Sequence, residues 1–283
     1  MTNPTVNPVP VGDVTFGSGD LPPIIAGPCV IESESHALDM AAMLKELVQN
    51  AGFSYVFKSS YDKANRSSIY SFRGPGIDKG LEILGKVRSK IGVPVLTDIH
   101  AVDQIARAAN VVSMIQIPAF LCRQTDLYIE AGKHDIAVNV KKGQFMSPES
   151  MGHIVDKARE CGIERLTLTE RGASFGYHRL VVDFTGMEIM KRFGAPLVFD
   201  GTHAVQQPAG SGSHSGGNRD FVPGLCRAAA ALGVHGFFLE VHDSPDDAPC
   251  DGPNMISPQT LIKLLKDIRA IVTGLKGNID DRA

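Results

Sequence analysis

The chain has 283 residues, of which 43% are apolar, with a formal charge of −3 and an isoelectric point near 6.3. This length fits one large domain or two ordinary ones. Because no composition break or charged linker separates two halves, we expect a single domain over residues 1–283. The mildly acidic balance gives no general basic field and argues against nucleic acid as a partner.

The amino-terminal sequence lacks both a basic leader and an apolar core, so it does not resemble a secretory signal. No apolar run approaches the roughly 20 residues that span a bilayer. We therefore expect a cytoplasmic protein with no membrane partner. In such a reducing location the five cysteines are expected to be thiols, and none of them forms the CxxC pair of a structural zinc module.

The first elements expected along the chain form a short β-hairpin. The apolar runs Val11–Phe16 and Ile24–Ile25 flank the turn-forming segment Gly17–Asp20. We expect this hairpin, in an extension over residues 1–20, to lead into the first strand of the main fold and to close its amino end. At the other terminus the polar segment Lys276–Ala283 is expected to fray.

Eight short β-rich segments follow, and each ends on a residue able to do chemistry. They are Ile24–Cys29, Tyr55–Lys58, Val95–Asp98, Met114–Gln116, Ala137–Lys141, Leu166–Arg171, Leu197–His203 and Gly236–Glu240. Helical periodicity or good helix formers lie between them, at about 36–51, 77–90, 102–109, 124–131, 148–161, 184–192, 220–232 and 258–272. This alternation predicts parallel β-α units, and eight in about 250 residues match an α/β TIM barrel, the (β/α)8 fold. In that fold the active site forms at the carboxyl ends of the strands, where these polar residues lie.

The segment Phe57–Ser68 is the densest chemical signal. Three cations are interleaved there with hydroxyl and amide side chains: Lys58, Lys63 and Arg66 with Ser60, Asn65, Ser67 and Ser68. Cations with such donors at a strand end favour a phosphorylated, hydroxylated ligand. The alternative is a solvated basic loop. Against it, three more cations follow later strands, at Lys141, Lys142 and Arg171.

A second group combines a thiol, an imidazole and two carboxylates: Cys29, His203, Glu240 and Asp251. These residues follow the first, seventh and eighth strands, and the first and eighth are adjacent in a closed barrel. The donor set suits a borderline divalent ion such as Zn, Fe(II), Mn or Co. The alternative is that Cys29 is a small buried core residue and His203 an ordinary loop histidine.

The segment Gln206–Arg219 is longer than the usual connections of a barrel and rich in glycine and serine. We interpret it as a mobile lid beside the site, the alternative being an inert flexible loop. Cys122, Cys161 and Cys226 are expected to be structural. His100 and His242 lie near the expected rim and stay undecided, and the other histidines, His36 among them, show no metal spacing.

Several motifs together carry a family resemblance. They are KANRSS (Lys63–Ser68), PAFLCRQTD (Pro118–Asp126), NVKKGQF (Asn139–Phe145), ERGASFGY (Glu170–Tyr177), FDGTHAVQ (Phe199–Gln206) and CDGP (Cys250–Pro253). With this order and spacing, from Ala26 to Ile268, the chain resembles the 3-deoxy-D-manno-octulosonate 8-phosphate synthase (2-dehydro-3-deoxyphosphooctonate aldolase) family. The resemblance implies a homotetrameric transferase that condenses phosphoenolpyruvate with D-arabinose 5-phosphate and water. Such an enzyme releases inorganic phosphate and serves KDO synthesis for lipopolysaccharide.

The resemblance also implies roles for individual positions. The catalytic positions are Lys63, Lys141, His203 and Asp251. The phosphoenolpyruvate site comprises Lys63, Lys141 and Arg171, with Lys58 and Gln144 beside them. The pentose positions are Asn65, Arg66, Ser67, Asp98 and Ser60, with Arg66 and Ser67 at the 5-phosphate. Gln116, at a strand end, belongs to the same substrate-binding set, and Phe120 and Arg123 match a loop that reaches toward a neighbouring subunit.

The position of Cys29 divides the resembled family. Metal-dependent members carry cysteine there and metal-independent members carry asparagine. The resemblance therefore places this chain with the metal users and implies no organic cofactor. Cys250 before Asp251 departs from that pattern, because this pairing is more typical of the metal-independent branch.

Two other functions are compatible with a phosphate-binding barrel. The related 3-deoxy-heptulosonate 7-phosphate synthase uses erythrose 4-phosphate and carries a Lys-Pro-Arg-Thr run, where this chain has Lys63-Ala64-Asn65-Arg66. A non-catalytic barrel that only binds phosphorylated sugars is the second alternative. The loss of a lysine or a metal ligand would favour it, and none of the matched positions is lost.

Overall fold

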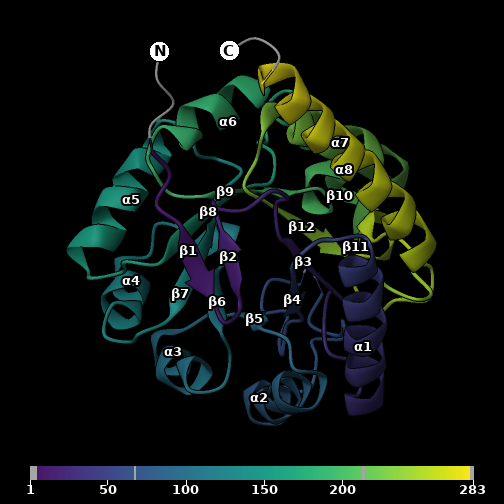
Figure 1. Cartoon of the computed structure of the whole chain (residues 1–283). Helices are drawn as coiled ribbons and strands as arrows, with labels where there is room; N and C mark the ends of the chain where they lie inside the picture. Colours follow the sequence, from purple (N-terminus) through teal and green to yellow (C-terminus); the bar gives the residue numbers. More distant parts are fainter. Residues whose placement is uncertain (1–4, 67, 212–213, 281–283) are drawn as a thin grey trace.

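Eight parallel strands close into a barrel in the computed structural model, which describes residues 5–66, 68–211 and 214–280 (Figure 1). The barrel strands are β3 (Ile24–Gly27), β4 (Tyr55–Lys58), β5 (Val95–Asp98), β6 (Met114–Ile117), β7 (Ala137–Lys141), β8 (Leu166–Glu170), β9 (Leu197–Asp200) and β12 (Gly236–Glu240). Each pairs with the next in this order, and β12 closes the ring against β3. The predicted (β/α)8 TIM barrel is confirmed.

The barrel strands are short runs that are buried along their whole length. A parallel strand covered on both faces requires such a continuous buried run. The observed bounds stay close to the predicted ones, although β3 ends at Gly27, before Cys29, and β6 continues to Ile117. Glycine is required at position 27, because a Cβ atom there would lie 2.0 Å from the carbonyl oxygen of Lys58 on β4.

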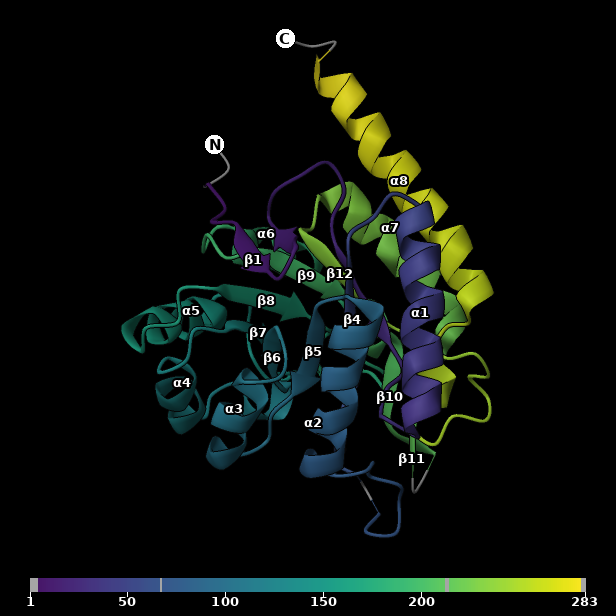
Figure 2. The same ribbon diagram turned by 60° about the horizontal axis from the view of Figure 1, so that its bottom comes forward.

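The α-helices of the described residues surround the barrel (Figure 1). They are α1 (Glu34–Asn50), α2 (Ile77–Lys86, continued by a π-helical turn over Val87–Ile91), α3 (Val102–Ala109), α4 (Thr125–Ala131), α5 (Ser150–Glu160), α6 (Phe184–Lys191), α7 (Val222–Leu232) and α8 (Pro258–Asp280). Helix α1 lies beside α8, so the first and last helices complete the ring (Figure 2).

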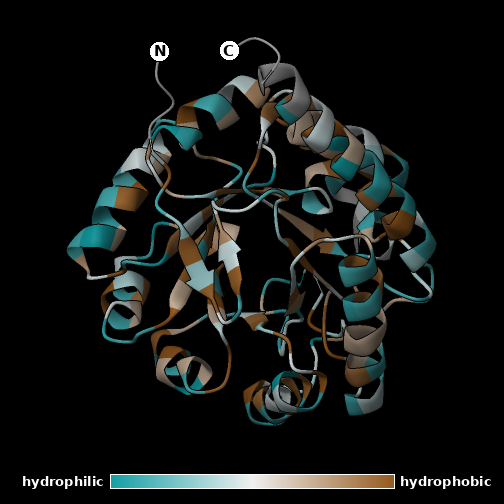
Figure 3. Cartoon of the chain, in the orientation of Figure 1, coloured by the Kyte–Doolittle hydropathy of each residue, from teal (hydrophilic) through white to brown (hydrophobic). Residues whose placement is uncertain are grey.

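These helices are amphipathic, and Figure 3 shows apolar and polar residues side by side on them. Helix α1 buries Ala37, Met40, Ala41, Leu44 and Val48, whose spacing of three and four residues keeps one face on the strands. Helix α8 runs to Asp280, so the tail expected to fray is helical over 276–280, while 281–283 lie outside the described residues. In the described part of the chain, no helix combines the length and apolarity that crossing a membrane requires.

The amino-terminal hairpin is formed by β1 (Val9–Val11) and β2 (Val14–Phe16), which pair antiparallel. The hairpin is confirmed, but its predicted turn at Gly17–Asp20 is wrong, because the chain reverses at Gly12, which has a φ of 61°. Four hairpin side chains form one apolar cluster with residues of the barrel strands: Val9, Val11, Val14 and Phe16 with Ile25, Val56, Leu96, Met114, Ala137, Val198 and Phe238. The hairpin therefore fills the amino end of the barrel.

The segment after β9, predicted as a lid, contains two paired strands. A 3₁₀ turn over His203–Val205 leads into β10 (Gln206–Ser211), which pairs antiparallel with β11 (His214–Gly217). At its far end Arg219 Nη2 donates to Asp246 Oδ1 at 2.7 Å and to the carbonyl of Gly252 at 2.8 Å. Arg219 therefore connects the end of this two-stranded ribbon to the segment that follows β12.

Candidate active site

Buried charged side chains gather where the barrel strands end. Each has at most 9% of its surface exposed: Lys58, Lys63, Asp98, Lys141, Lys142, Glu170, Arg171, Asp200 and Glu240. Burial of a charge is costly unless it is paired or hydrogen-bonded. A concentration of such groups at one end of the barrel is therefore a sign of function rather than of packing.

Lys58, Lys63 and Glu240 form the first ion-pair network. Lys58 Nζ donates to Glu240 Oε1 at 2.7 Å and to the carbonyl of Cys29 at 3.1 Å, and Lys63 Nζ lies 3.8 Å from the same carboxylate oxygen. Burial alone would raise the pKa of Glu240, but Lys58 and Lys63 outweigh it and hold this pKa below its usual value. Burial alone would lower the pKa of Lys63, but Cys29 and Glu240 raise this pKa well above its usual value, so Lys63 stays charged.

Lys141, Asp200 and His203 form the second network. Lys141 Nζ donates to Asp200 Oδ2 at 2.6 Å, and that oxygen lies 2.7 Å from His203 Nδ1. Burial lowers the pKa of Lys141 despite the attraction of Asp200. Asp200 itself has a lowered pKa, because His203 and Lys141 outweigh its burial. Asp200 is not among the predicted site residues, although it is the last residue of β9 and lies in the FDGTHAVQ motif.

Asp98 is held by two short hydrogen bonds, from Ser60 Oγ and from Gln116 Nε2. Gln116 is fixed in turn by Asn139, whose amide donates to Gln116 Oε1 at 2.7 Å and accepts from Thr167 and Thr169. This series of side-chain hydrogen bonds extends from β5 to β8 and gives Asp98 one defined orientation. Burial would raise the pKa of Asp98, but Lys58 and Lys63 lower it below its usual value.

Three of the predicted ligand-binding side chains have buried polar atoms without a hydrogen-bond partner among the described residues. Arg171 Nη2 donates to Gln206 Oε1 at 2.9 Å, whereas its Nη1 is unpaired, and Gln144 Oε1 and Arg66 Nε are unpaired as well. Buried polar atoms are rarely left unpaired in folded proteins. Their position near the cationic cluster indicates that a ligand with complementary oxygens and hydroxyls satisfies them.

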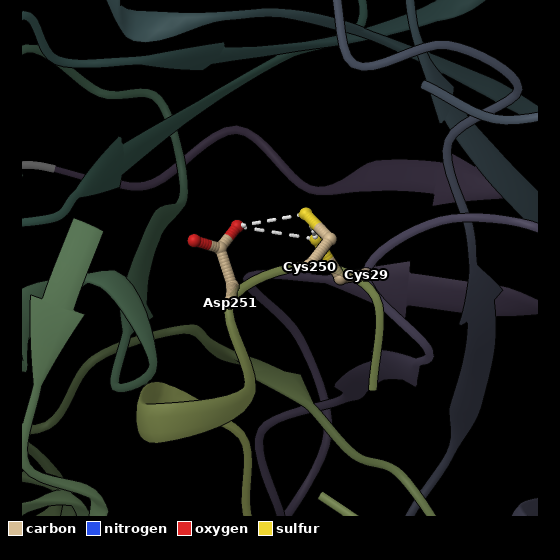
Figure 4. Close-up of side chains that lie close together, drawn as sticks. All are labelled: Cys29, Cys250 and Asp251. Atoms are coloured by element: carbon tan, nitrogen blue, oxygen red, sulfur yellow. Dashed lines mark hydrogen bonds between the residues drawn. The ribbon is translucent and has the colours of Figure 1, made fainter. Parts of the chain in front are cut away.

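The four predicted metal ligands do not form one compact group but two groups that share Asp251. One is Cys29, Cys250 and Asp251, and the other is His203, Glu240 and Asp251, each with its ligand atoms within 4.8 Å of one another. Figure 4 shows both sulfurs directed at Asp251 Oδ2, at 3.1 Å from Cys29 and 3.4 Å from Cys250. The two sulfurs themselves are 2.7 Å apart.

These residues fit a divalent cation. Glu240 Oε2 is buried without a hydrogen-bond partner among the described residues, and it lies 3.8 Å from His203 Nε2. A positive ion would satisfy both atoms together with Asp251 and a thiolate. Burial, Cys250 and Glu240 raise the pKa of the Cys29 thiol well above its usual value, so binding of a cation has to displace that proton.

The remaining predicted residues lie at the edge of this cluster or outside it. Arg66 donates to Cys250 Sγ at 3.2 Å and to the carbonyl of Pro249 at 3.1 Å, and Asn65 is exposed. Ser67 lies outside the described residues. Phe120 and Arg123 are exposed, and no described side-chain contact joins either of them to the cluster.

A closed (β/α)8 barrel with buried lysines, an arginine and carboxylates at its carboxyl end is the arrangement of an enzyme for anionic substrates. The sequence model of the DAHP synthetase I family matches residues 3–273. Proteins called 2-dehydro-3-deoxyphosphooctonate aldolase are similar over almost the whole chain. The one from Trichlorobacter lovleyi is 54% identical, over 92% of this chain and 96% of its own length.

Two further relatives of the same name are also similar over most of this chain and of their own. The protein of Syntrophotalea carbinolica is 51% identical, over 95% of this chain and 98% of its own, and that of Desulfatibacillum aliphaticivorans is 55% identical, over 88% and 91%. The chain belongs to the DAHP synthetase I family and, within it, to the 2-dehydro-3-deoxyphosphooctonate aldolases.

Proposed function

We propose that this protein condenses phosphoenolpyruvate with D-arabinose 5-phosphate and water, giving 3-deoxy-D-manno-octulosonate 8-phosphate and inorganic phosphate for KDO and lipopolysaccharide synthesis. One observation carries the proposal: Lys58, Lys63, Lys141 and Arg171 are all buried at one end of the barrel, in a chain 54% identical to an enzyme of that name. Two small phosphorylated substrates explain so many buried cations.

Phosphoenolpyruvate is assigned to the inner cations. Lys63, Lys141 and Arg171 bind its phosphate and carboxylate, with Lys58 and Gln144 beside them. Two features support the assignment. Lys63 keeps its charge because nearby negative groups raise its pKa, and the free Nη1 of Arg171 can donate to a ligand oxygen.

Arabinose 5-phosphate is assigned to the outer part of the site. Asn65, Arg66 and Ser67 bind the pentose and its phosphate, and Ser60 lies near the aldehyde. Asp98, oriented by Gln116, accepts a hydrogen bond from a sugar hydroxyl. Its lowered pKa supports this role, because a carboxylate that stays ionised is an acceptor only.

In the reaction, the methylene carbon of phosphoenolpyruvate forms a bond to the aldehyde carbon of the pentose. Water adds at the adjacent carbon, and the resulting hemiketal phosphate loses phosphate by C–O cleavage. The cations stabilise charge on the phosphate and carboxylate throughout. Lys141 is assigned as the donor of the proton that the aldehyde oxygen takes up when the carbon–carbon bond forms, since burial lowers the pKa of Lys141 and it lies 3.4 Å from His203 Nδ1.

Cys29, His203, Glu240 and Asp251 are the proposed ligands of a divalent ion of the Zn, Fe(II), Mn or Co class. When bound, such an ion polarises the aldehyde or orients the attacking water. His203 connects this group to Lys141 through Asp200, so the two parts of the site are linked by hydrogen bonds. We further propose a single-domain cytoplasmic homotetramer, in which the exposed Phe120 and Arg123 reach a neighbouring subunit.

Release of inorganic phosphate tests the proposal most directly. The purified protein is incubated with phosphoenolpyruvate and either arabinose 5-phosphate or erythrose 4-phosphate, with and without chelator. We expect phosphate release with the pentose and little with the tetrose. Preference for erythrose 4-phosphate would assign the heptulosonate reaction instead, and no release with either sugar under any added ion would leave only a sugar-phosphate-binding barrel.

A further inference from the structure

Two histidines and two carboxylates form a separate cluster between the start of α1 and the loop after β12. They are Glu32, His36, His242 and Asp243. The two imidazole rings lie 4.9 Å apart, centre to centre. The proposed reaction uses none of these residues.

The ring nitrogens face the two carboxylates in a regular way. His36 Nε2 and His242 Nδ1 lie 3.0 and 3.2 Å from the same oxygen, Asp243 Oδ1. The opposite nitrogens, His36 Nδ1 and His242 Nε2, lie 4.0 and 2.7 Å from Glu32 Oε1. Each imidazole therefore lies between Asp243 and Glu32, with one nitrogen toward each.

The state of His36 is informative. With Nε2 donating to Asp243, the neutral ring carries its lone pair on Nδ1, and this atom is buried with no hydrogen-bond partner among the described residues. Glu32 Oε1, which is also an acceptor, lies 4.0 Å from this atom. A cation or a proton between these two acceptors would satisfy both. Among the described residues, no lysine or arginine forms an ion pair with Glu32 or Asp243.

We propose that His36 Nδ1, His242 Nε2 and Glu32 Oε1 bind a divalent cation of the zinc class, distinct from the proposed catalytic ion, with Asp243 orienting both rings. The three ligand atoms lie within 4.8 Å of one another, and a tetrahedral zinc ion needs about 3.3 Å between ligands. On binding, the 2.7 Å distance between His242 Nε2 and Glu32 Oε1 therefore has to lengthen slightly, and the 4.0 Å distance between His36 Nδ1 and Glu32 Oε1 has to shorten. A carboxylate behind the non-ligating nitrogen of a metal-bound histidine is the usual outer partner of such sites.

Binding requires a proton to move within His242. His242 Nδ1 accepts from the Ser244 backbone at 2.9 Å, so the neutral ring carries its proton on Nε2, toward Glu32. For Nε2 to bind the cation, this proton has to move to Nδ1, which then donates to Asp243 at the expense of the Ser244 hydrogen bond. Because only a neutral imidazole offers a lone pair, protons compete with the cation, and metal uptake should weaken as the pH falls.

Such an ion would join two parts of the fold. His36 is in the first turn of α1, and His242 begins the segment that leads to Cys250 and Asp251 of the active site. A cation bound at His36 and His242 would tie this segment to the first helix. We expect zinc to raise the melting temperature of the protein through this link.

The test uses the full-length protein freed of metal and titrated with Co²⁺ and with Zn²⁺. Cobalt at a site containing Cys29 gives thiolate charge-transfer absorption in the near ultraviolet, whereas cobalt at the histidine–glutamate cluster gives none, so the two sites are counted separately. We expect the wild type to bind one equivalent without charge transfer. His36→Gln and Glu32→Gln should lose that equivalent and its effect on the melting temperature, with any charge-transfer band unchanged.

His134→Ala is the matched control. His134 pairs with Glu130 four residues earlier, as His36 does with Glu32, but among the described residues no second histidine forms an ion pair with Glu130. This variant should bind metal as the wild type does. If the wild type takes up no equivalent without charge transfer, or if His36→Gln and Glu32→Gln retain it, the cluster is a proton-bridged pair and the proposal is overturned.

Discussion

Lys58 donates a 2.7 Å hydrogen bond to Glu240, a residue 182 positions further along the chain. The two side chains extend from β4 and β12, which flank β3, and Lys58 also donates to the carbonyl of Cys29 just beyond β3. This pair joins the proposed phosphoenolpyruvate site to the proposed metal site. A change on either side is therefore expected to affect both.

The first prediction concerns the stability of this pair. Lys58→Met leaves Glu240 buried with the more distant Lys63 and His203, each at 3.8 Å, so we expect a loss of about 3 kcal/mol in the free energy of unfolding. Urea unfolding of metal-free protein measures it. The double variant Lys58→Met/Glu240→Leu should recover part of the loss, because the buried carboxylate that lost its closest partner is removed as well. Strictly additive losses would contradict the coupling.

The second prediction concerns the pH dependence of stability at Asp98. The pKa of Asp98 in the folded protein lies below its unfolded value of about 3.9. The ionised carboxylate therefore stabilises the fold fully above about pH 5, and this contribution is lost as the pH falls through the lower folded pKa. Asp98→Asn should be less stable than the wild type at pH 7 by about 1–3 kcal/mol and should lose less stability on acidification. Parallel stability curves from pH 7 to pH 3 would contradict this.

The third prediction concerns the pentose phosphate. Arg66 can grip a phosphate with two parallel hydrogen bonds, which lysine cannot reproduce. Arg66→Ala is expected to raise the KM for arabinose 5-phosphate roughly tenfold or more, with a much smaller effect on the KM for phosphoenolpyruvate. Arg66→Lys should recover little of the loss. Arg88→Ala, which removes a surface arginine bonded to a backbone carbonyl, is the control. Equal effects on both substrates would rule out the assignment.

Much of the fold was predictable because each barrel strand is a continuous run of buried residues, and six of the eight end on a charged one, the exceptions being β3 at Gly27 and β6 at Ile117. The hairpin turn was misplaced for a physical reason: Gly12 and Gly17 both adopt a positive φ, of 61° and 80°, and composition does not say which of them reverses the chain. The ribbon β10–β11 was missed because its pairing uses backbone groups within a segment whose glycines and serines carry no strand pattern.

The site was predictable in its composition but not in its grouping. Lys58, Asp98, Lys141 and Glu240 could be predicted as site residues, because each is the last residue of a barrel strand and the strand ends form the site. Cys250 lies 221 residues from Cys29, and only the folded chain brings their sulfurs together. The cluster of His36 and His242 was missed likewise, because its histidines come from opposite ends of the sequence and show no local metal spacing.

The last prediction concerns Cys29. If Cys29 is a metal ligand, chelation should abolish activity and a divalent ion should restore it. Cys29→Asn should then lose the tightly bound ion, because a neutral amide oxygen is a much weaker ligand for these metals than a thiolate. Some activity should remain, since the metal-independent members of the resembled family carry asparagine at this position and the cations of the phosphoenolpyruvate site are unchanged.

A structural role for Cys29 gives the reverse pattern: chelator-resistant activity in the wild type, and a less stable Cys29→Asn with a buried, poorly paired amide. Elemental analysis beside activity distinguishes the two roles. Cys161→Ala removes a thiol at the end of α5, outside the metal-ligand groups, and should keep both the ion and the activity. The proposed cation cluster at His36 holds no sulfur, so an ion bound there gives no thiolate charge-transfer band. Loss of this band from cobalt-loaded Cys29→Asn therefore shows that the lost ion was bound by Cys29. Full activity of a demonstrably metal-free wild type would refute the metal role.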